Sequence, residues 1–280
     1  RCEVSGVRLN ARSELEAGRA GSSSLRQILL YIRENRMRVA GLICPTRHAL
    51  YDEEFLEPRL DLIRRSMSLV RSLETEELLV RCGRIPDPVE TSAVPPPASS
   101  VREPADVNPF GFSGFPKGSV TGLKRQTEAD RFSLLCEIVN DLAKYGNHVG
   151  CTLNLMVAAY RPQLISKLLS NITCGPVRIV LDPATAVMTG ESSTSLVDLY
   201  RSFHAAIGYV RARDAIRDVD GAGVEVAVGD GNVDWLELLL TMEDAAFTGW
   251  TCIERTGGDH RREDVVHGLT HLRSLIPQRE

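Results

Sequence analysis

Two short apolar runs, Val177-Arg-Ile-Val-Leu-Asp182 and Ile207-Gly-Tyr-Val-Arg-Ala-Arg213, decide the fold. Both have the length and composition that are typical of buried strands. Similar runs recur along the whole chain, at residues 6–10, 38–44, 77–83, 149–156 and 250–254. The sequence therefore predicts seven buried strands.

Segments with the periodicity of amphipathic helices lie between these strands. Apolar residues recur at helical spacing from Leu56 to Val70 and from Trp235 to Ala246, and similar stripes occupy 25–32, 134–142 and 265–276. Strands that alternate with helices predict a parallel sheet covered by helices, because a parallel connection needs a crossover. A closed (β/α)8 barrel has eight strands. We therefore expect one strand–helix unit to be missing, which would leave a seam with unpaired strand edges.

One connection is unlike the others. Residues 84–122 hold eight prolines, serine-rich stretches and the run Phe110-Gly-Phe-Ser-Gly-Phe115. We interpret the sequence as a single domain, residues 1–280, with this proline-rich insertion as a loop between a strand and the helix that follows. Loops of this length are disordered insertions or lids, and the sequence leaves both possibilities open.

Composition excludes several classes of function. The chain has 280 residues, is 43% hydrophobic and carries a net charge of −4. It has no basic excess that would favour nucleic acid, and it has neither an apolar stretch long enough to span a membrane nor a signal segment. The seven cysteines form no Cys-x-x-Cys pair, which favours free thiols in a reducing compartment. We expect a cytoplasmic protein without nucleic-acid or membrane partners.

Strand alternation predicts which side chains face the barrel interior. By this rule Asn154 and Met156 face inward. Charged side chains converge on the mouth, at the carboxyl ends of the strands, from five positions: Arg81, Asp182, Arg211, Arg213 and Glu254. Active sites of barrels lie at that end. The alternative is a polar plug, in which these arginines and carboxylates only pair with one another.

Four motifs resemble a known family in their order and spacing. They are Leu181-Asp-Pro-Ala-Thr185, Val210-Arg-Ala-Arg-Asp-Ala215, Gly229-Asp-Gly-Asn-Val-Asp-Trp235 and Ile253-Glu-Arg-Thr-Gly-Gly258. Together they resemble the xylose isomerase-like TIM barrels of the sugar phosphate isomerase/epimerase group. The resemblance implies a TIM (β/α)8 barrel whose first strand–helix unit would precede Arg1.

The resemblance also implies a degenerate metal site. Active members hold a divalent metal, often manganese, with Glu, Asp, His and Glu at the ends of strands five to eight. The Asp falls on Asp182 and the last Glu on Glu254, but Met156 and Arg211 stand at the other two positions. A thioether or a guanidinium cannot replace the lost ligands of a hard cation. We expect Arg211 to occupy the ion's place and to pair with Asp182 or Glu254; an incomplete Mn²⁺ or Mg²⁺ site is the alternative.

The implied function is that of a sugar phosphate isomerase/epimerase-like protein acting on a small carbohydrate by enediol-type proton transfer. In this hypothesis Glu254 and Asp182 are catalytic. The residues expected to contact a small carbohydrate or sugar phosphate are Arg211, Arg213, Arg81 and Asn154. The alternative is a metal-free pseudoenzyme that binds a sugar or another anion without turnover. A metal-dependent endonuclease on the same fold is disfavoured by the net charge and the incomplete ligand set.

Overall fold

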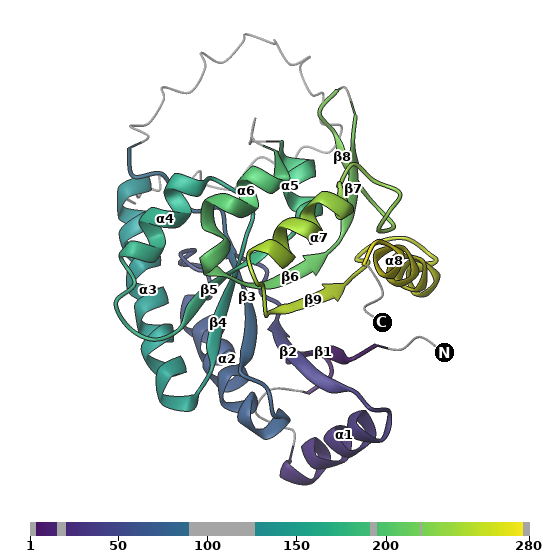
Figure 1. Ribbon diagram of the computed structural model, residues 1–280. Coiled ribbons are helices and arrows are strands. Elements are labelled where there is room, and N and C mark those ends of the chain that lie inside the picture. The colour runs from purple at the N-terminus through teal and green to yellow at the C-terminus, as the bar shows by residue number, and fades with distance from the viewer. Residues whose placement is uncertain (1–3, 16–20, 90–126, 191–194, 219, 277–280) are drawn as a thin grey trace, which may run out of the picture.

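A parallel sheet that curls into a nearly closed barrel forms the centre of the protein. The computed structural model describes residues 4–15, 21–89, 127–190, 195–218 and 220–276 (Figure 1). In this part of the chain the sheet has seven strands in the order β1-β2-β3-β4-β5-β6-β9, and every neighbouring pair is parallel. The strands are β1 (Gly6–Asn10), β2 (Arg38–Cys44), β3 (Glu77–Gly83), β4 (Thr152–Val157), β5 (Val177–Leu181), β6 (Ile207–Ala212) and β9 (Trp250–Ile253).

Helices cover the outside of the sheet and connect the strands (Figure 1). They are α1 (Ser22–Glu34), α2 (Leu56–Leu69), α3 (Glu128–Val149), α4 (Pro162–Ser170), α5 (Pro183–Thr189), α6 (Leu196–Phe203), α7 (Trp235–Asp244) and α8 (Arg261–Leu275), with 3-10 turns η1 (Arg71–Leu73) and η2 (His204–Ala206). The helix α3 begins with a capping box between Thr127 and Asp130 and ends at Gly150, whose φ of 70° suits a residue without Cβ. The proline-rich insertion lies between β3 and α3, and residues 90–126, which include most of it, lie outside the described part of the chain.

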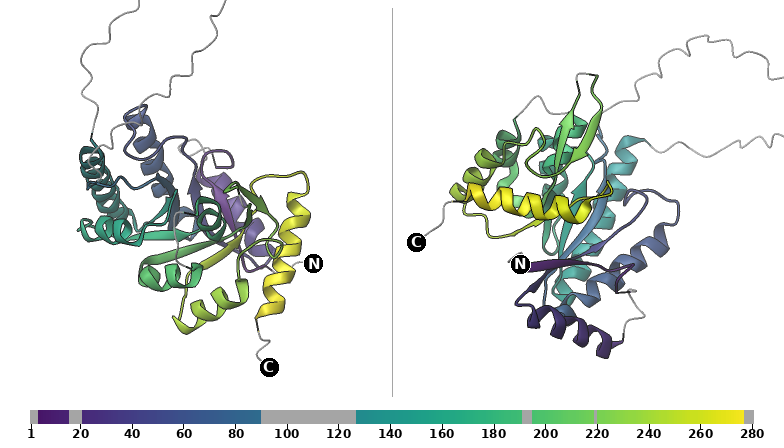
Figure 2. Two further views of the ribbon diagram at one scale, coloured as in Figure 1. Left: turned by 90° about the horizontal axis from the view of Figure 1, so that it is seen from above. Right: turned by 90° about the vertical axis from the view of Figure 1, so that its right-hand side faces the viewer.

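A two-stranded antiparallel hairpin, β7 (Asp214–Arg217) and β8 (Gly223–Val226), follows β6 directly. The sequence analysis did not predict it, because its strands have four residues each and Ile216 and Val224 are exposed. The hairpin stands beside α5 at the carboxyl ends of the barrel strands, as Figure 2 shows. It therefore brings residues of its own to the mouth.

The packing confirms the predicted facing of the strands. Leu153, Leu155 and Val210 belong to the large apolar cluster between the sheet and the helices. A smaller cluster fills the barrel interior and consists of Leu79, Val180 and Tyr209, with Ile43, Met156, Trp250 and Cys252 packed against it. Cys44, Cys82 and Cys151 are buried free thiols. Among the described residues no helix is long and apolar enough to cross a membrane.

Candidate functional site

Arg211 lies between the two carboxylates that the sequence analysis placed at the mouth. Its Nε and Nη2 donate to Glu254 Oε2 at 3.0 and 2.7 Å, and its Nη1 donates to Asp182 Oδ2 at 3.0 Å. All three side chains are at most 14% exposed. Burial lowers the pKa of Arg211, and the charge of Asp182 partly offsets this effect. The guanidinium thus joins the ends of β5, β6 and β9.

Arg213 extends this network to the hairpin. Its Nη1 donates to Asp182 Oδ2 at 2.7 Å, and its Nε and Nη2 form a fork on the two carboxylate oxygens of Glu225, at 3.2 and 2.9 Å. Burial alone would raise the pKa of Glu225, but hydrogen bonds from Arg213 and Thr256 outweigh it and lower this pKa to about 2. The ionised Glu225 side chain therefore links β8 to Arg213 at the mouth.

A third arginine reaches the network from β1. Arg8 forms an ion pair with Glu254 through the oxygen that Arg211 does not use, Oε1. The sequence analysis missed Arg8 and Glu225. Strand alternation in the run 6–10 contained the signal for Arg8, whereas the unpredicted hairpin gave none for Glu225. With both included, Arg8, Arg211 and Arg213 face Glu254, Asp182 and Glu225, and a further pair, Arg255 with Asp264, adjoins Glu225, so the formal charges of these eight side chains cancel.

Backbone and hydroxyl donors fix Asp182 further. Its Oδ1 accepts the N–H of Thr185 at 3.1 Å and so caps α5. The buried hydroxyl of Tyr160 accepts the N–H of Asp182 at 2.6 Å and donates to the carbonyl of Val180 at 2.9 Å. Burial, together with the charge of Asp182, raises the pKa of Tyr160. Asp182 is therefore held rigidly as a negatively charged anchor for both arginines.

A neighbouring carboxylate, Asp214, organises the loop that leads into α7. It is fully buried and accepts hydrogen bonds from the Trp235 indole at 2.8 Å and from the N–H groups of Ala215, Gly229 and Val233, at 2.9, 3.0 and 3.2 Å. Asp234 then caps α7 by accepting the N–H of Glu237 at 2.9 Å. The glycine-rich run 229–235 is thus a helix-capping loop built around Asp214.

The structure separates the other predicted site residues from this network. Arg81 is exposed on the barrel-facing side of β3 and forms no ion pair with the described residues. Met156 is half-buried against the interior apolar cluster. Asn154 is fully buried but donates to Glu77, at the amino end of β3. Asn154, which we expected to contact a small carbohydrate, thus faces the barrel interior two residues before Met156 on β4 and is engaged by Glu77.

The residues at the mouth do not fit a hard divalent cation. Each carboxylate is already occupied by guanidinium donors, and Arg211 brings a positive charge to the space between Asp182 and Glu254. Within the described ranges no group of three or more His, Cys, Asp or Glu side chains is arranged to hold a metal ion.

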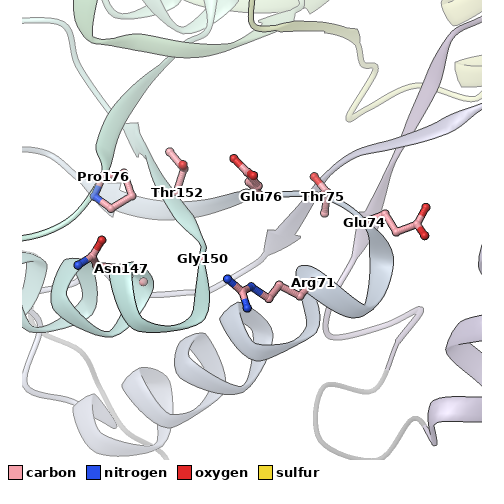
Figure 3. Close-up of a pocket in the computed structure, with 9 residues that line it drawn as sticks. Arg71, Glu74, Thr75, Glu76, Asn147, Gly150, Thr152 and Pro176 are labelled. Carbon is pink, nitrogen blue, oxygen red and sulfur yellow. The ribbon is translucent and has the colours of Figure 1, made fainter.

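Two cavities at opposite ends of the barrel are relevant to a ligand site. One, of about 840 Å³, runs from Arg8, Arg211 and Glu254 at the mouth along the space between β1 and β9 toward α8. The other, of about 540 Å³, lies at the opposite end of the barrel and is lined by Arg71, Asn147 and neighbouring residues (Figure 3). Of these two cavities the first contacts the arginine–carboxylate network and the second does not, so the first is the candidate ligand site.

No protein-family model matches the sequence, and no curated protein matches it. Solved structures do match. A xylose isomerase domain protein from Planctomyces limnophilus superposes with a TM-score of 0.72 at 15% identity, over 97% of this chain and 87% of that one. A xylose isomerase-like TIM barrel protein from Mycobacterium smegmatis, in complex with magnesium, gives 0.68 at 14% identity, over 97% and 83%.

A D-tagatose 3-epimerase-like protein gives a TM-score of 0.70 at 12% identity, over 98% of this chain and 88% of that one. Identities this low establish the fold and leave the activity open. The fold expected from the four sequence motifs is confirmed: the chain has the architecture of the xylose isomerase-like TIM barrels.

Proposed function

We propose that this protein is an isomerase/epimerase-like protein that binds a small carbohydrate at the mouth of its barrel without a divalent metal. The observation that carries the proposal is the position of Arg211, whose guanidinium bridges Asp182 and Glu254. Similar folds belong to a 3-keto-D-glucoside 4-epimerase from E. coli and to a D-psicose 3-epimerase from Clostridium cellulolyticum solved with D-tagatose. The names of those proteins support a small carbohydrate as the ligand class, and the position of Arg211 between the carboxylates supports a site that works without a metal.

The chemistry of the mouth suits a polyhydroxylated ligand. Guanidinium groups donate and carboxylates accept hydrogen bonds, so the network offers both partners that sugar hydroxyl groups require. The adjoining cavity of about 840 Å³ lies within the range of small-molecule sites, roughly 300–1,000 Å³. Arg81 does not line this cavity, but no described carboxylate engages it, so its guanidinium is free to bind the phosphate group of a sugar phosphate that extends beyond the cavity. A sugar or sugar phosphate is therefore the ligand class that we propose.

Glu254 is the group that would move a proton. A carbonyl oxygen of the ligand can take an Arg211 N–H, which releases Glu254 Oε2. The carboxylate then removes the proton from the carbon beside the carbonyl, and Arg211 and Arg213 stabilise the enediolate oxygen. Glu254 returns the proton to the former carbonyl carbon, while the hydroxyl proton on the other carbon of the enediolate passes to the former carbonyl oxygen, so a ketose and an aldose interconvert without an oxidant or reductant. Asp182 keeps both guanidinium groups in position.

One observation favours a second function, binding without turnover. Both oxygens of Glu254 are engaged by arginine, and both oxygens of Asp182 accept hydrogen bonds. A carboxylate in this state is a weak base until a ligand displaces its partners. If no ligand does so, the same mouth binds a sugar but leaves its carbon-bound protons in place.

Isotope exchange distinguishes these functions. Chelator-treated protein is incubated in ²H₂O with a panel of aldoses, ketoses and their phosphate esters, and NMR follows deuterium at the carbon beside the carbonyl. The enzymatic proposal predicts incorporation by the natural protein and by the control Glu34→Gln, on exposed α1, and at least about 100-fold less by Glu254→Gln.

Binding measured by calorimetry completes the test. Saturable sugar binding without deuterium incorporation would assign the second function. Absence of binding to every compound of the panel would contradict both. Tighter binding of phosphate esters, lost in Arg81→Met, is the result expected for a sugar phosphate ligand.

A further inference from the structure

The cavity at the amino end of the barrel, the amino-end cavity, has no part in the site at the mouth. It has a volume of about 540 Å³ and lies where η1 and the end of α3 meet the beginning of β3 and β4 (Figure 3). Small-molecule sites have volumes of roughly 300–1,000 Å³. Six of the nine residues that line this cavity have polar side chains, which favours a polar or charged ligand.

Arg71 brings a positive charge to the amino-end cavity. Its side chain extends from η1 to Gly150, where a Cβ would lie 2.8 Å from the Arg71 Nε and 2.9 Å from Nη2 (Figure 3). Gly150 has a φ of 70° at the end of α3, so the absence of a Cβ suits this backbone conformation and also leaves room for the guanidinium. Among the described residues Arg71 has no carboxylate partner, so its N–H donors are available to a ligand.

Negative charge reaches the amino-end cavity from two sources. The first is Glu76, an exposed carboxylate that forms no ion pair in the described part of the chain; Glu74, in contrast, is engaged by Arg33. The second is the end of α3, which lines the cavity through Asn147 and Gly150. The last carbonyl groups of a helix have no intrahelical partner and form the negative end of its dipole. The cavity therefore offers acceptors as well as donors.

Neutral polar groups complete the lining. The side chains of Asn147 and Thr152 form no hydrogen bond with another described residue. Buried Thr75 accepts the N–H of Glu77 through Oγ1 at 3.4 Å, which leaves its hydroxyl proton free to donate. The N–H of Thr152 donates to the carbonyl of Glu76 at 2.6 Å, so the pairing of β3 with β4 places these two residues on adjacent strands beside the cavity.

This combination of charges discriminates among small ligands. A simple anion would be attracted by Arg71 but repelled by Glu76 and by the carbonyl end of α3. A simple cation would be repelled by Arg71. A molecule that carries both a carboxylate and an ammonium group finds a partner for each, because a guanidinium donates two parallel hydrogen bonds to a carboxylate and an ammonium group donates to carboxylate and carbonyl oxygens.

We propose that the amino-end cavity binds a small zwitterion, a free amino acid. The carboxylate of the ligand accepts hydrogen bonds from Arg71, and its ammonium group donates to Glu76 and to the last carbonyl groups of α3. Asn147 and Thr152 contact the rest of the ligand. The proposal does not depend on the proposed function, because this cavity and the cavity that contacts Glu254 lie at opposite ends of the barrel.

Calorimetry of the natural protein with a panel of the common α-amino acids, β-alanine and γ-aminobutyrate provides the first test. The proposal predicts saturable binding of at least one member. The N-acetyl derivative of that compound lacks the ammonium charge and its amide lacks the carboxylate, so each should bind at least about tenfold more weakly. Absence of saturable binding by every member, or equal binding of either derivative, would overturn the proposal.

Two matched pairs of variants test the charges. Arg71→Met and Glu76→Gln should each weaken binding at least about tenfold. Their controls, Arg65→Met and Glu57→Gln, change exposed side chains on α2 outside the cavity and should leave binding unchanged. Binding that persists undiminished in Arg71→Met would contradict the assignment.

NMR chemical shifts of the natural protein locate the bound ligand. On saturation with the tightest member of the panel, the amide resonances of Gly150 and Thr152 should shift, whereas those of Asp182 and Glu254 at the mouth should not. Because this experiment needs no variant, it decides the proposal even if Arg71→Met does not fold. Shifts at Asp182 and Glu254 without shifts at Gly150 and Thr152 would show that the amino acid binds at the mouth and not in this cavity, and the proposal would be wrong.

Discussion

Acidic side chains at the two ends of the barrel interior have different partners: arginines at the mouth and a neutral amide at the amino end. At the mouth, Asp182, Glu254 and Glu225 face three arginines. At the amino end, Glu77 accepts a hydrogen bond from the Asn154 amide and feels Arg178 only at a distance.

Opposite pKa shifts follow from this difference. Burial raises the pKa of Glu77, and Asn154 and Arg178 offset it only in part. At the mouth, donors from Arg213 and Thr256 overcome the same burial effect at Glu225. Burial alone therefore does not set the charge state of a carboxyl group; the number of donors aimed at it does.

The largest expected effect comes from removing the cation that two buried carboxylates share. Arg211→Met should lower the free energy of unfolding by about 3–5 kcal/mol at pH 7, because it leaves Asp182 and Glu254 incompletely compensated. Urea denaturation measures this loss. The control Arg65→Met removes an exposed pair with Asp61 and should change stability by less than about 0.5 kcal/mol. A loss below about 1 kcal/mol in Arg211→Met would show that the mouth does not need its cation.

Removal of a buried carboxylate that is held by neutral donors should destabilise the protein almost as much. Asp214→Ala removes the acceptor of four hydrogen bonds in the loop before α7 and should cost about 3 kcal/mol. Asp230→Ala, which removes an exposed partner of His267, is the control and should cost less than about 0.5 kcal/mol. Equal losses in the two variants would argue against the role of Asp214 as the organiser of this loop.

Glu225→Gln should lower the free energy of unfolding by about 1–2 kcal/mol at pH 7, because it removes the charge from the bidentate hydrogen bonds with Arg213. The pKa of Glu225 is lower in the folded protein, about 2, than in the unfolded chain. Its stabilisation is therefore present above the ordinary pKa of Glu and is lost as pH falls toward 2. Unfolding curves from pH 7 to pH 3 should show the variant and the natural protein converging, whereas a constant difference would contradict the assignment.

The smallest expected change in the free energy of unfolding is an increase, in contrast to the losses above. Glu77→Gln should raise stability at pH 7 by about 1 kcal/mol, because a neutral amide replaces a carboxyl group whose ionisation is disfavoured. Because the pKa of Glu77 is raised in the folded protein, the contribution of this one group to stability is fully present below the ordinary pKa of Glu and is lost as pH rises through the folded value. The gain should therefore disappear in acid, and destabilisation at pH 7 would contradict the comparison.

The amino end of the barrel also shows a feature that could not be predicted from the sequence, the partner of Asn154. Alternation placed Asn154 correctly inside the barrel, but the rule does not say at which height along the barrel its partner lies. Register supplies that information: Asn154 pairs with Leu79 and lies beside the place of a Cβ on Gly208, which would be 2.4 Å from its Oδ1. Neither fact is visible in one sequence.

At the mouth the sequence was more informative. Period-two patterns placed Asp182, Arg211 and Glu254 together, because side chains at the carboxyl ends of adjacent parallel strands must converge. Glu225 was missed because the hairpin that carries it is short and exposed, so it has no apolar pattern. Helices α4 to α6 were not located individually, since they have nine residues or fewer and give weak periodicity.

The central claim is that arginines, and not a metal ion, neutralise the carboxylates of the mouth. Calorimetric titration of Mn²⁺ into chelator-stripped protein tests it most directly. The comparison is Met156→Glu/Arg211→His, because this double variant restores the carboxylate and the imidazole that the family resemblance implies at these two positions. The account predicts no binding by the natural protein and micromolar binding by the double variant. Micromolar binding by the natural protein that is lost in Glu254→Gln would contradict it.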